Sequence, residues 1–225
     1  FVKSNPELEE YARFRAACEQ QRAPWPKWPP RLRSGDLQPQ DYSEEAVRYH
    51  LYVQWLAYEQ IRSLAEKVRV AGQTLYLDFP LGVHPYSYDV WRERDLFVQG
   101  VSVGAPPDAV FTGGQDWVFP PLHPEKIRDE GYRYYVSCLR RHMSLSSLLR
   151  IDHVMGLHRL FWIPKGLKPG DGVYVRYPAE ELYAILCLES HRHRCRIVGE
   201  NLGTVPRYVN TNLARHKIHR MYVAQ

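Results

Sequence analysis

The chain has 225 residues, a formal net charge of +5, 44% hydrophobic residues and 24% charged residues, which fits one large globular domain or two small ones. No run approaches the roughly 20 apolar residues that a membrane span requires, so no membrane partner is expected. The basic residues are interleaved with acidic ones, so no nucleic-acid partner is expected either. Four scattered cysteines without a C-x-x-C pair favour a reducing, cytoplasmic location.

Residues 1–72 are predicted to form a helical segment. Residues 5–21 read as a short helix, and residues 24–39 carry five prolines, which predicts a non-helical connector. A long helix is predicted next, with Asp41 as its N-cap, Glu44 completing a capping box and Gly72 closing it. Its apolar positions recur in steps of three and four, so the aromatic residues Trp55 and Tyr58 on this stripe are expected in the core.

Residues 73–225 show a different pattern, in which short β-prone runs alternate with helices. The runs are residues 75–79, 148–152 and 195–200, and helices are predicted at 132–143 and 179–191. This alternation predicts an α/β fold with a parallel sheet, which in barrel enzymes carries catalytic groups at the C-terminal ends of its strands. The last run, residues 220–225, is predicted to be a further strand. Because the chain also lacks an initiator Met, we expect a piece of a longer protein.

Two of these runs end in carboxylates that could act together. Asp152 and Glu200 each stand just past a hydrophobic strand, and two carboxylates in one cleft are the minimum for cleaving a glycosidic bond. Arg150 lies on the same strand face as Asp152, where its charge would keep a nucleophile ionised. On this pattern alone, ordinary salt-bridged surface acids are an equal alternative.

Several motifs make the pattern specific. Arg-Ile-Asp-His stands at 150–153 and Gly-Glu-Asn-Leu-Gly at 199–203. Further blocks are Gly-Ala-Pro-Pro-Asp at 104–108, Gly-Gln-Asp-Trp at 114–117, Pro-Pro-Leu-His-Pro at 120–124, and the segments 52–56, 77–84 and 88–91. In this order they closely resemble the 4-α-glucanotransferase family (amylomaltase, or disproportionating enzyme), relatives of the α-amylases. The likeness spans residues 9 to 225.

The resemblance implies a fold and a reaction. The fold would be a (β/α)8 TIM barrel with helical insertions, of which residues 73–225 supply the central strands, roughly the third to the sixth, and catalytic loops. The reaction would be transfer of α-1,4-glucan segments between maltodextrins by a retaining double displacement, with no cofactor and no metal. Retention predicts that the carboxyl groups of Asp152 and Glu200 lie roughly 5–6 Å apart.

The resemblance also assigns roles by position. Asp152 matches the nucleophile and Glu200 the general acid/base. Arg150 matches the arginine that supports the nucleophile, and His153 a residue lining the sugar site. The remaining predicted substrate-binding residues lie in matching blocks: Asp108, Gln115, Trp117 and Asp89. Trp117 is expected to be a stacking platform for a sugar ring, whereas Asp78, inside a strand, is expected to be structural.

Three departures from the family pattern keep alternatives open. Tyr86 stands where an Asp is common, Asn201 replaces the Asp after the acid, and Val118 replaces the Gly after the loop Trp. The family's third carboxylate is expected downstream of residue 225, so the segment alone is predicted to be inactive. The alternatives are an α-amylase-type hydrolase and a catalytically silent glucan-binding homologue.

A metal site is a further alternative that the sequence raises and disfavours. His191, His193 and Cys195 alternate between a helix and a strand. Alternating residues in such a link rarely converge on one ion, and no second pair of ligands is near. A solvated basic turn is therefore predicted here.

Overall fold

The computed structural model describes residues 1–224. They form two compact units: residues 1–66 with 84–94, and residues 67–83 with 95 onward. The units are not contiguous in sequence, since residues 84–94 join the first. Every helix in the described part of the chain is too short or too polar to cross a bilayer.

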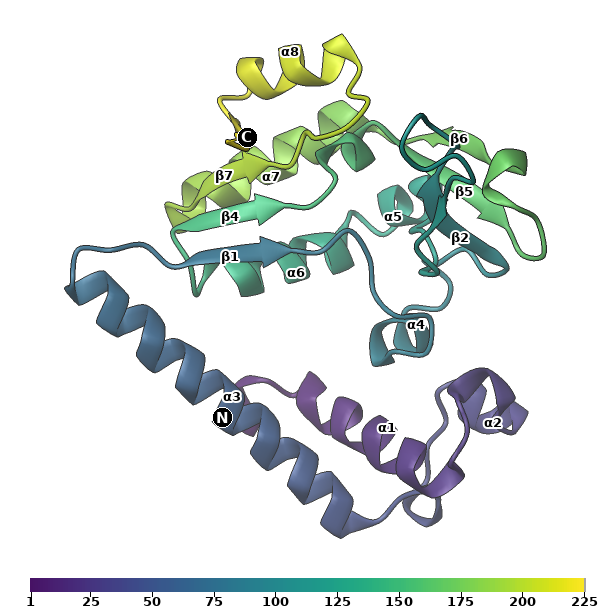
Figure 1. Ribbon diagram of the computed structural model, residues 1–225. Helices are drawn as coiled ribbons and strands as arrows, with labels where there is room; N and C mark the ends of the chain where they lie inside the picture. The colour runs from purple at the N-terminus through teal and green to yellow at the C-terminus, as the bar shows by residue number, and fades with distance from the viewer. Residues whose placement is uncertain (225) are drawn as a thin grey trace. The chain divides into compact units, whose positions relative to one another are not determined.

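The first unit is helical (Figure 1). It holds α1 (Glu7–Gln21), α2 (Pro30–Arg33), most of α3 (Glu44–Val70) and α4 (Tyr88–Arg92), with 3₁₀ turns at Val2–Ser4, Trp25–Lys27 and Pro39–Asp41. Its core is aromatic: the Phe14 ring lies 5.4 Å from the Trp28 ring and 4.9 Å from the Trp91 ring. Trp91 is fully buried, and its indole N–H donates to the Leu32 carbonyl at 2.9 Å, the partner that a buried Trp needs.

Two predicted details of this unit are wrong. The connector at 24–39 contains a helical turn, because Pro30 stands at the first position of α2, where its missing N–H and fixed φ are tolerated. Helix α3 begins at Glu44, so Asp41 does not cap it. Asp41 instead accepts hydrogen bonds from both terminal nitrogens of Arg31, at 2.9 and 2.8 Å, and from the Gln38 backbone. Asp41 therefore closes the preceding turn.

The apolar stripe of α3 is only partly buried. Val47 is buried, but the Trp55 side chain is 40% exposed, so the prediction of a core Trp55 is wrong for the described residues. Tyr58 is half-buried and stacks on Phe1, with ring centroids 5.3 Å apart. Periodicity shows that a helix has an apolar face, but not which element covers it.

The second unit is built on a parallel sheet. Its strands β1 (Tyr76–Phe79), β4 (Leu148–Ile151), β7 (Arg196–Gly199) and β8 (His219–Arg220) lie side by side in that order (Figure 1). The main helices between them are α6 (Arg133–Met143), α7 (Ala179–His193) and α8 (Arg207–Arg215), and a short α5 (Pro124–Asp129) precedes α6. The strand order follows the chain without reversal, as in a barrel wall and unlike a doubly wound sheet. The predicted partial (β/α)8 barrel is confirmed.

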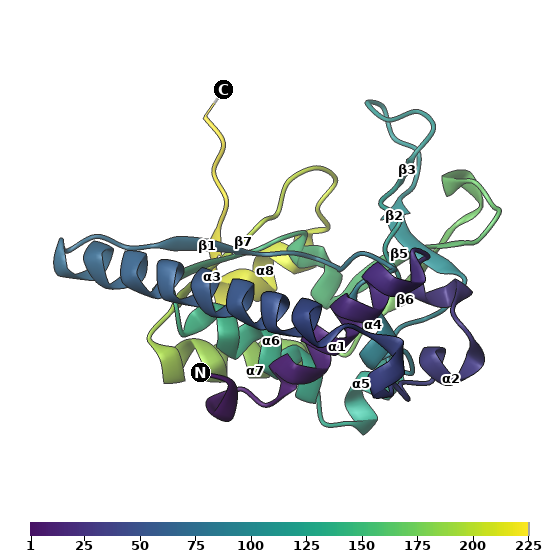
Figure 2. The same ribbon diagram turned by 90° about the horizontal axis from the view of Figure 1, so that it is seen from below.

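Strand alternation divides the sheet into two different faces. Leu149, Ile151 and Ile197 are buried and pack in one cluster with Leu139 of α6 and Leu186 of α7. Figure 2 shows α6 and α7 on the same side of the sheet. The alternate residues, which include Asp78 and Arg150, point to the other face. In a barrel that second face lines the interior, so functional side chains belong there.

A second, antiparallel sheet was not predicted from the sequence. It contains β3 (Gln115–Asp116), β2 (Val101–Ala105), β5 (Arg159–Pro164) and β6 (Val173–Arg176) in that order. Its strands come from insertions after β1 and after β4. Gly104 permits the β2–β3 pairing, since a Cβ there would lie 2.0 Å from the Gln115 carbonyl oxygen. The predicted last strand is also displaced: it is His219–Arg220, residues 221–224 are irregular, and residue 225 lies outside the described residues.

A strained residue follows β3. Val118 has φ +66°, in the left-handed region that a β-branched side chain disfavours. Its neighbours hold it there, because Trp117 donates its backbone N–H to the Val103 carbonyl and the Val103 N–H donates to the Phe119 carbonyl, both at 2.9 Å. The Asp116 carboxylate also accepts the Val118 N–H at 2.8 Å. Val118 is thus the extra residue of a bulge opposite Val103.

A buried carboxylate ties α6 to α7. Glu189 is 1% exposed and accepts two hydrogen bonds from Arg140, both at 2.9 Å, and one from Arg192 at 2.8 Å. The hydrogen bond from Arg140 is the main reason that the pKa of Glu189 lies below its ordinary value, and burial opposes it. This ion pair fixes how the two helices are aligned on the sheet.

We predict that Val118→Gly raises the free energy of unfolding by about 0.5–1 kcal/mol. Relief of the left-handed backbone is worth about 1–2 kcal/mol, and the greater freedom of Gly in the unfolded chain offsets part of it. Urea unfolding measures the change. Val110→Gly is the control, since Val110 is exposed and has no positive φ, so that variant should only lose stability. A loss in both variants would show that Val118 is unstrained.

We predict that Glu189→Gln lowers the free energy of unfolding by about 1–3 kcal/mol, the range for a hydrogen bond to a charged group. A carboxyl whose pKa is lowered by folding contributes stability above its unfolded pKa, about 4.3, and that stability is lost as the pH falls through the folded value. The difference in the free energy of unfolding between this variant and wild type should therefore have its full size at neutral pH and shrink below about pH 4. Urea titrations at several pH values measure it.

The matched control for this variant is Glu180→Gln on the same helix. The Glu180 carboxylate is 64% exposed and pairs with Arg215 at 3.4 Å. Exposed ion pairs contribute little to the free energy of unfolding, so the free energy of unfolding of this variant should equal that of wild type. Equal losses in the two variants would contradict the role given to Glu189.

Candidate active site

The two predicted catalytic carboxylates leave neighbouring strands at the same edge of the sheet. Asp152 follows β4, and its backbone N–H donates to the Phe79 carbonyl at the end of β1, at 3.0 Å. Glu200 follows β7, and its N–H donates to the Ile151 carbonyl at 2.9 Å. These bonds continue the parallel ladder one residue past the strand ends. The backbone therefore brings Asp152 and Glu200 to adjoining positions.

Backbone donors hold the side chain of Glu200. One carboxylate oxygen accepts the His153 N–H at 3.0 Å and the other accepts the Leu202 N–H at 2.8 Å. His153 has φ +45°, and this left-handed turn after Asp152 aims its N–H at Glu200. Glu200 is only 9% exposed. Its carboxylate is thereby oriented by two neutral donors, one of them from the loop that follows Asp152.

Arg150 lies between the carboxylates of Asp152 and Asp78 and contacts both. One terminal nitrogen of Arg150 donates to Asp152 at 2.7 Å, and the other lies 2.7 and 2.9 Å from the two oxygens of Asp78. Partial burial opposes the charge on Arg150, but the hydrogen bond with Asp78 and the charges of both carboxylates together raise its pKa above the ordinary value. The predicted pairing of Arg150 with Asp152 is present.

His153 connects the carboxylates to the loop after β3. Its ring meets the Trp117 ring edge to face, with centroids 5.1 Å apart, and Trp117 also stacks on Phe119 at 6.3 Å. Burial lowers the pKa of His153 below its ordinary value, and the charges of Glu200 and Asp152 oppose that shift. The imidazole is therefore neutral at pH 7 and serves as an aromatic contact for Trp117.

The other three predicted binding residues, Gln115, Asp108 and Asp89, lie in three different surroundings. Gln115 accepts the Trp117 indole N–H at 3.2 Å and so belongs to the same group. Asp108 accepts the Val110 and Phe111 backbone N–H groups, at 2.8 and 2.6 Å, and shapes its own loop. Asp89 lies in α4 of the first unit. The roles of Gln115, Asp108 and Asp89 as binding residues remain predictions.

Asn201, one of the departures, has a local function. Its side-chain N–H donates to the Asn210 side chain at 2.8 Å, and its side-chain carbonyl oxygen accepts the Met221 backbone N–H at 3.1 Å. The amide uses both its donor and its acceptor, which links the loop of Glu200 to α8 and to the segment after β8. Asn201 lacks the charge of the Asp that is usual at this position, and its side chain makes these two hydrogen bonds instead.

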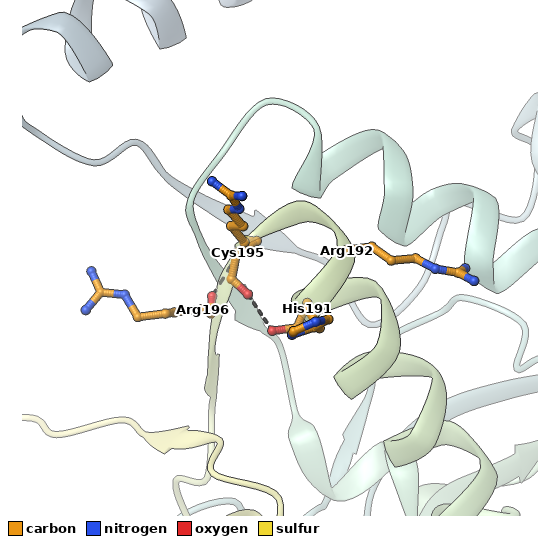
Figure 3. Close-up of a pocket in the computed structure, with 6 residues that line it drawn as sticks. His191, Arg192, Cys195 and Arg196 are labelled. Atoms are coloured by element: carbon orange, nitrogen blue, oxygen red, sulfur yellow. Dashed lines mark hydrogen bonds between the residues drawn. The ribbon is translucent and has the colours of Figure 1, made fainter.

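A hollow at the opposite edge of the sheet carries no comparable arrangement (Figure 3). It is lined by Ser190, His191, Arg192, Arg194, Cys195 and Arg196, where α7 leads into β7. In Figure 3 the side chains of Arg192 and Arg196 point away from each other, so they do not surround one ligand. His193 contacts the Glu189 carbonyl of its own helix, at 3.0 Å. No group of three metal-binding side chains occurs in the described part of the chain.

Sequence reasoning missed the part that Asp78 plays in this site. The signal was present in the strand pattern. Asp78 is one residue from the end of β1, and Arg150 is one residue from the end of β4, so adjacent parallel strands place them opposite each other. The backbone donors of His153 and Leu202 have no such signal, because they depend on loop conformation.

Comparisons with known proteins agree with this geometry. A family model described as 4-alpha-glucanotransferase matches residues 1–225. A 4-alpha-glucanotransferase of Haemophilus influenzae is 41% identical over 181 residues, which are 80% of this chain and 26% of that protein. One of Mycobacterium bovis is 38% identical over 212 residues, 92% of this chain and 29% of that protein.

Solved structures give the same result for the fold. The crystal structure of amylomaltase from Corynebacterium glutamicum matches with a TM-score of 0.83 and 31% identity, over 98% of this chain and 30% of that one. Amylomaltase from Streptococcus agalactiae in complex with acarbose matches with a TM-score of 0.88 and 22% identity, over 99% of this chain and 47% of that one. The chain thus spans between a quarter and a half of these relatives. On this evidence, the chain belongs to the 4-alpha-glucanotransferase family.

Proposed function

We propose that the protein containing this chain transfers α-1,4-glucan segments between maltodextrins, such as those derived from starch or glycogen. The observation that carries the proposal is the placement of Asp152 and Glu200 just past neighbouring parallel strands, one beside a fixed cation and the other beside neutral donors. The family relatives named 4-alpha-glucanotransferase support it. A cytoplasmic location, inferred from cysteine usage, is part of the proposal.

In the first step Asp152 is the nucleophile. One of its oxygens forms a bond to the anomeric carbon while the bond from that carbon to the glycosidic oxygen breaks. Glu200 gives its proton to the departing oxygen, so the leaving glucan exits as an alcohol. The hydrogen bond from Arg150 holds one oxygen of Asp152 in place and leaves the other to attack.

In the second step Glu200 reverses its role. It takes the proton of the acceptor's 4-hydroxyl, whose oxygen bonds to the anomeric carbon as the bond to Asp152 breaks. Each Glu200 oxygen accepts one backbone hydrogen bond and keeps a second lone pair, so the proton can come and go without breaking either bond. Each step inverts the configuration of the anomeric carbon, so the two steps together retain it.

Trp117 is the proposed sugar platform. It is held from the loop side by Gln115 and from the carboxylate side by His153. An aromatic face fixed in this way can stack on a glucose ring beside the reacting bond. Product analysis after incubation of the full-length protein with maltotriose tests the proposal: oligomers longer and shorter than the substrate mean transfer. Glucose and maltose alone would mean hydrolysis, and no products would mean a silent homologue.

We predict that Asp152→Asn in the full-length protein lowers transfer by several orders of magnitude while maltodextrin binding persists. The amide keeps the size of the side chain but cannot form the covalent intermediate. Initial rates on maltotriose and calorimetric binding measure the two effects. Asp129→Asn, on the exposed end of α5, is the control and should have wild-type rates. Near-normal transfer by Asp152→Asn would refute its role.

We predict that Glu200→Gln is equally severe on maltotriose but partly rescued on α-maltotriosyl fluoride. Fluoride leaves without a proton, so the first step no longer needs the acid. The rescue is measured as the rate on the fluoride divided by the rate on maltotriose, and this ratio is compared between the variant and wild type. Glu125→Gln on α5 is an exposed control. An unchanged ratio in Glu200→Gln would show that Glu200 is not the acid.

A further inference from the structure

Asp78 holds Arg150 from the side opposite the nucleophile. Both Asp78 oxygens lie within 2.9 Å of one terminal nitrogen of Arg150, and the other terminal nitrogen contacts one oxygen of Asp152 at 2.7 Å. The guanidinium is planar and rigid. Anchoring one of its nitrogens therefore sets the direction in which the other points.

The sheet itself fixes this arrangement. Asp78 in β1 and Arg150 in β4 are register partners, and both side chains lie on the face opposite the helices. Their backbones cannot slide without moving Leu77 and Leu149, which pack in the core on the other face. Asp78 is therefore a fixed anchor.

The pair is too exposed for stability to be its main contribution. The Asp78 side chain is 60% exposed and that of Arg150 22%. Ion pairs with an exposed partner contribute little to the free energy of unfolding. Orientation is the more informative consequence of the contact.

An arginine without another partner tends to bind a carboxylate with two parallel hydrogen bonds. Here Asp78 occupies one terminal nitrogen, and Arg150 contacts Asp152 through the other alone. Among the described residues, no hydrogen bond to the second oxygen of Asp152 is present, so that oxygen is available for attack.

We propose that Asp78 is a positioning residue, which restricts Arg150 to a single hydrogen bond with Asp152 and so leaves one nucleophile oxygen free. The inference rests on the proposed function. Without Asp78, Arg150 turns to bind both oxygens of Asp152. The bond from Asp152 to the anomeric carbon then forms more slowly, whichever group departs.

The test uses the full-length protein and two donors, maltotriose and α-maltotriosyl fluoride. Asp78→Asn should lower kcat on both donors by about 10²-fold, the effect of misplacing a reacting group, with little change in KM. The equal loss separates it from Glu200→Gln, for which the fluoride is predicted to restore rate. Asp78→Glu, which keeps the charge, should recover part of the loss. Glu180→Gln is the surface control.

A double-mutant cycle asks whether Asp78 acts through Arg150. In an Arg150→Ala background, Asp78→Asn should cause no further loss on the fluoride donor, because there is nothing left to position. A kcat within twofold of wild type in Asp78→Asn, or the same loss in both backgrounds, would overturn the inference. If Asp78→Asn does not fold, Asp78→Glu and the cycle built with it decide in the same way.

The two proposals fail differently. A wild-type protein that is inert on both donors would reject the proposed function. An active wild-type protein with an unaffected Asp78→Asn variant would reject only the role of Asp78.

Discussion

The parallel hydrogen bonding of β1, β4 and β7 is the constraint on which the site depends. Leu148 is in register with Tyr76 on one side and Arg196 on the other, so the three strands end level. Two further backbone bonds carry the ladder to Asp152 and Glu200. Side chains that are 48 residues apart in sequence thereby leave the sheet next to each other. The helices on the opposite face stabilise this edge by burying alternate residues of the same strands.

The surroundings of the two carboxylates differ in a way that suits their proposed roles. Asp152 contacts a guanidinium, which remains charged at any pH of interest. Glu200 contacts only backbone N–H groups through its side chain in the described residues. Neutral donors orient a carboxylate without the full field of a cation. The proposed acid/base is thus oriented by neutral donors and the proposed nucleophile by a cation.

The inserted antiparallel sheet extends the site beyond the carboxylates. It ends in the bulge at Val118, which leaves Trp117 against the His153 ring. His153 thus contributes in two ways: its backbone N–H orients Glu200, and its ring positions Trp117. The left-handed conformation of His153 serves both contacts. A local backbone strain is therefore tied to the geometry of the whole site.

Local sequence patterns were enough to predict the main helices and strands and the candidate carboxylates. Helices at 132–143 and 179–191 and the strands ending at Asp152 and Glu200 were predicted because hydrophobic periodicity and strand-end carboxylates are local features. The contacts of each side chain depend on the tertiary structure. It exposed Trp55, paired short strands such as Val101–Ala105 into a second sheet, and set Asp78 opposite Arg150. These outcomes depend on register and on contacts between segments far apart in the chain, which local patterns do not encode.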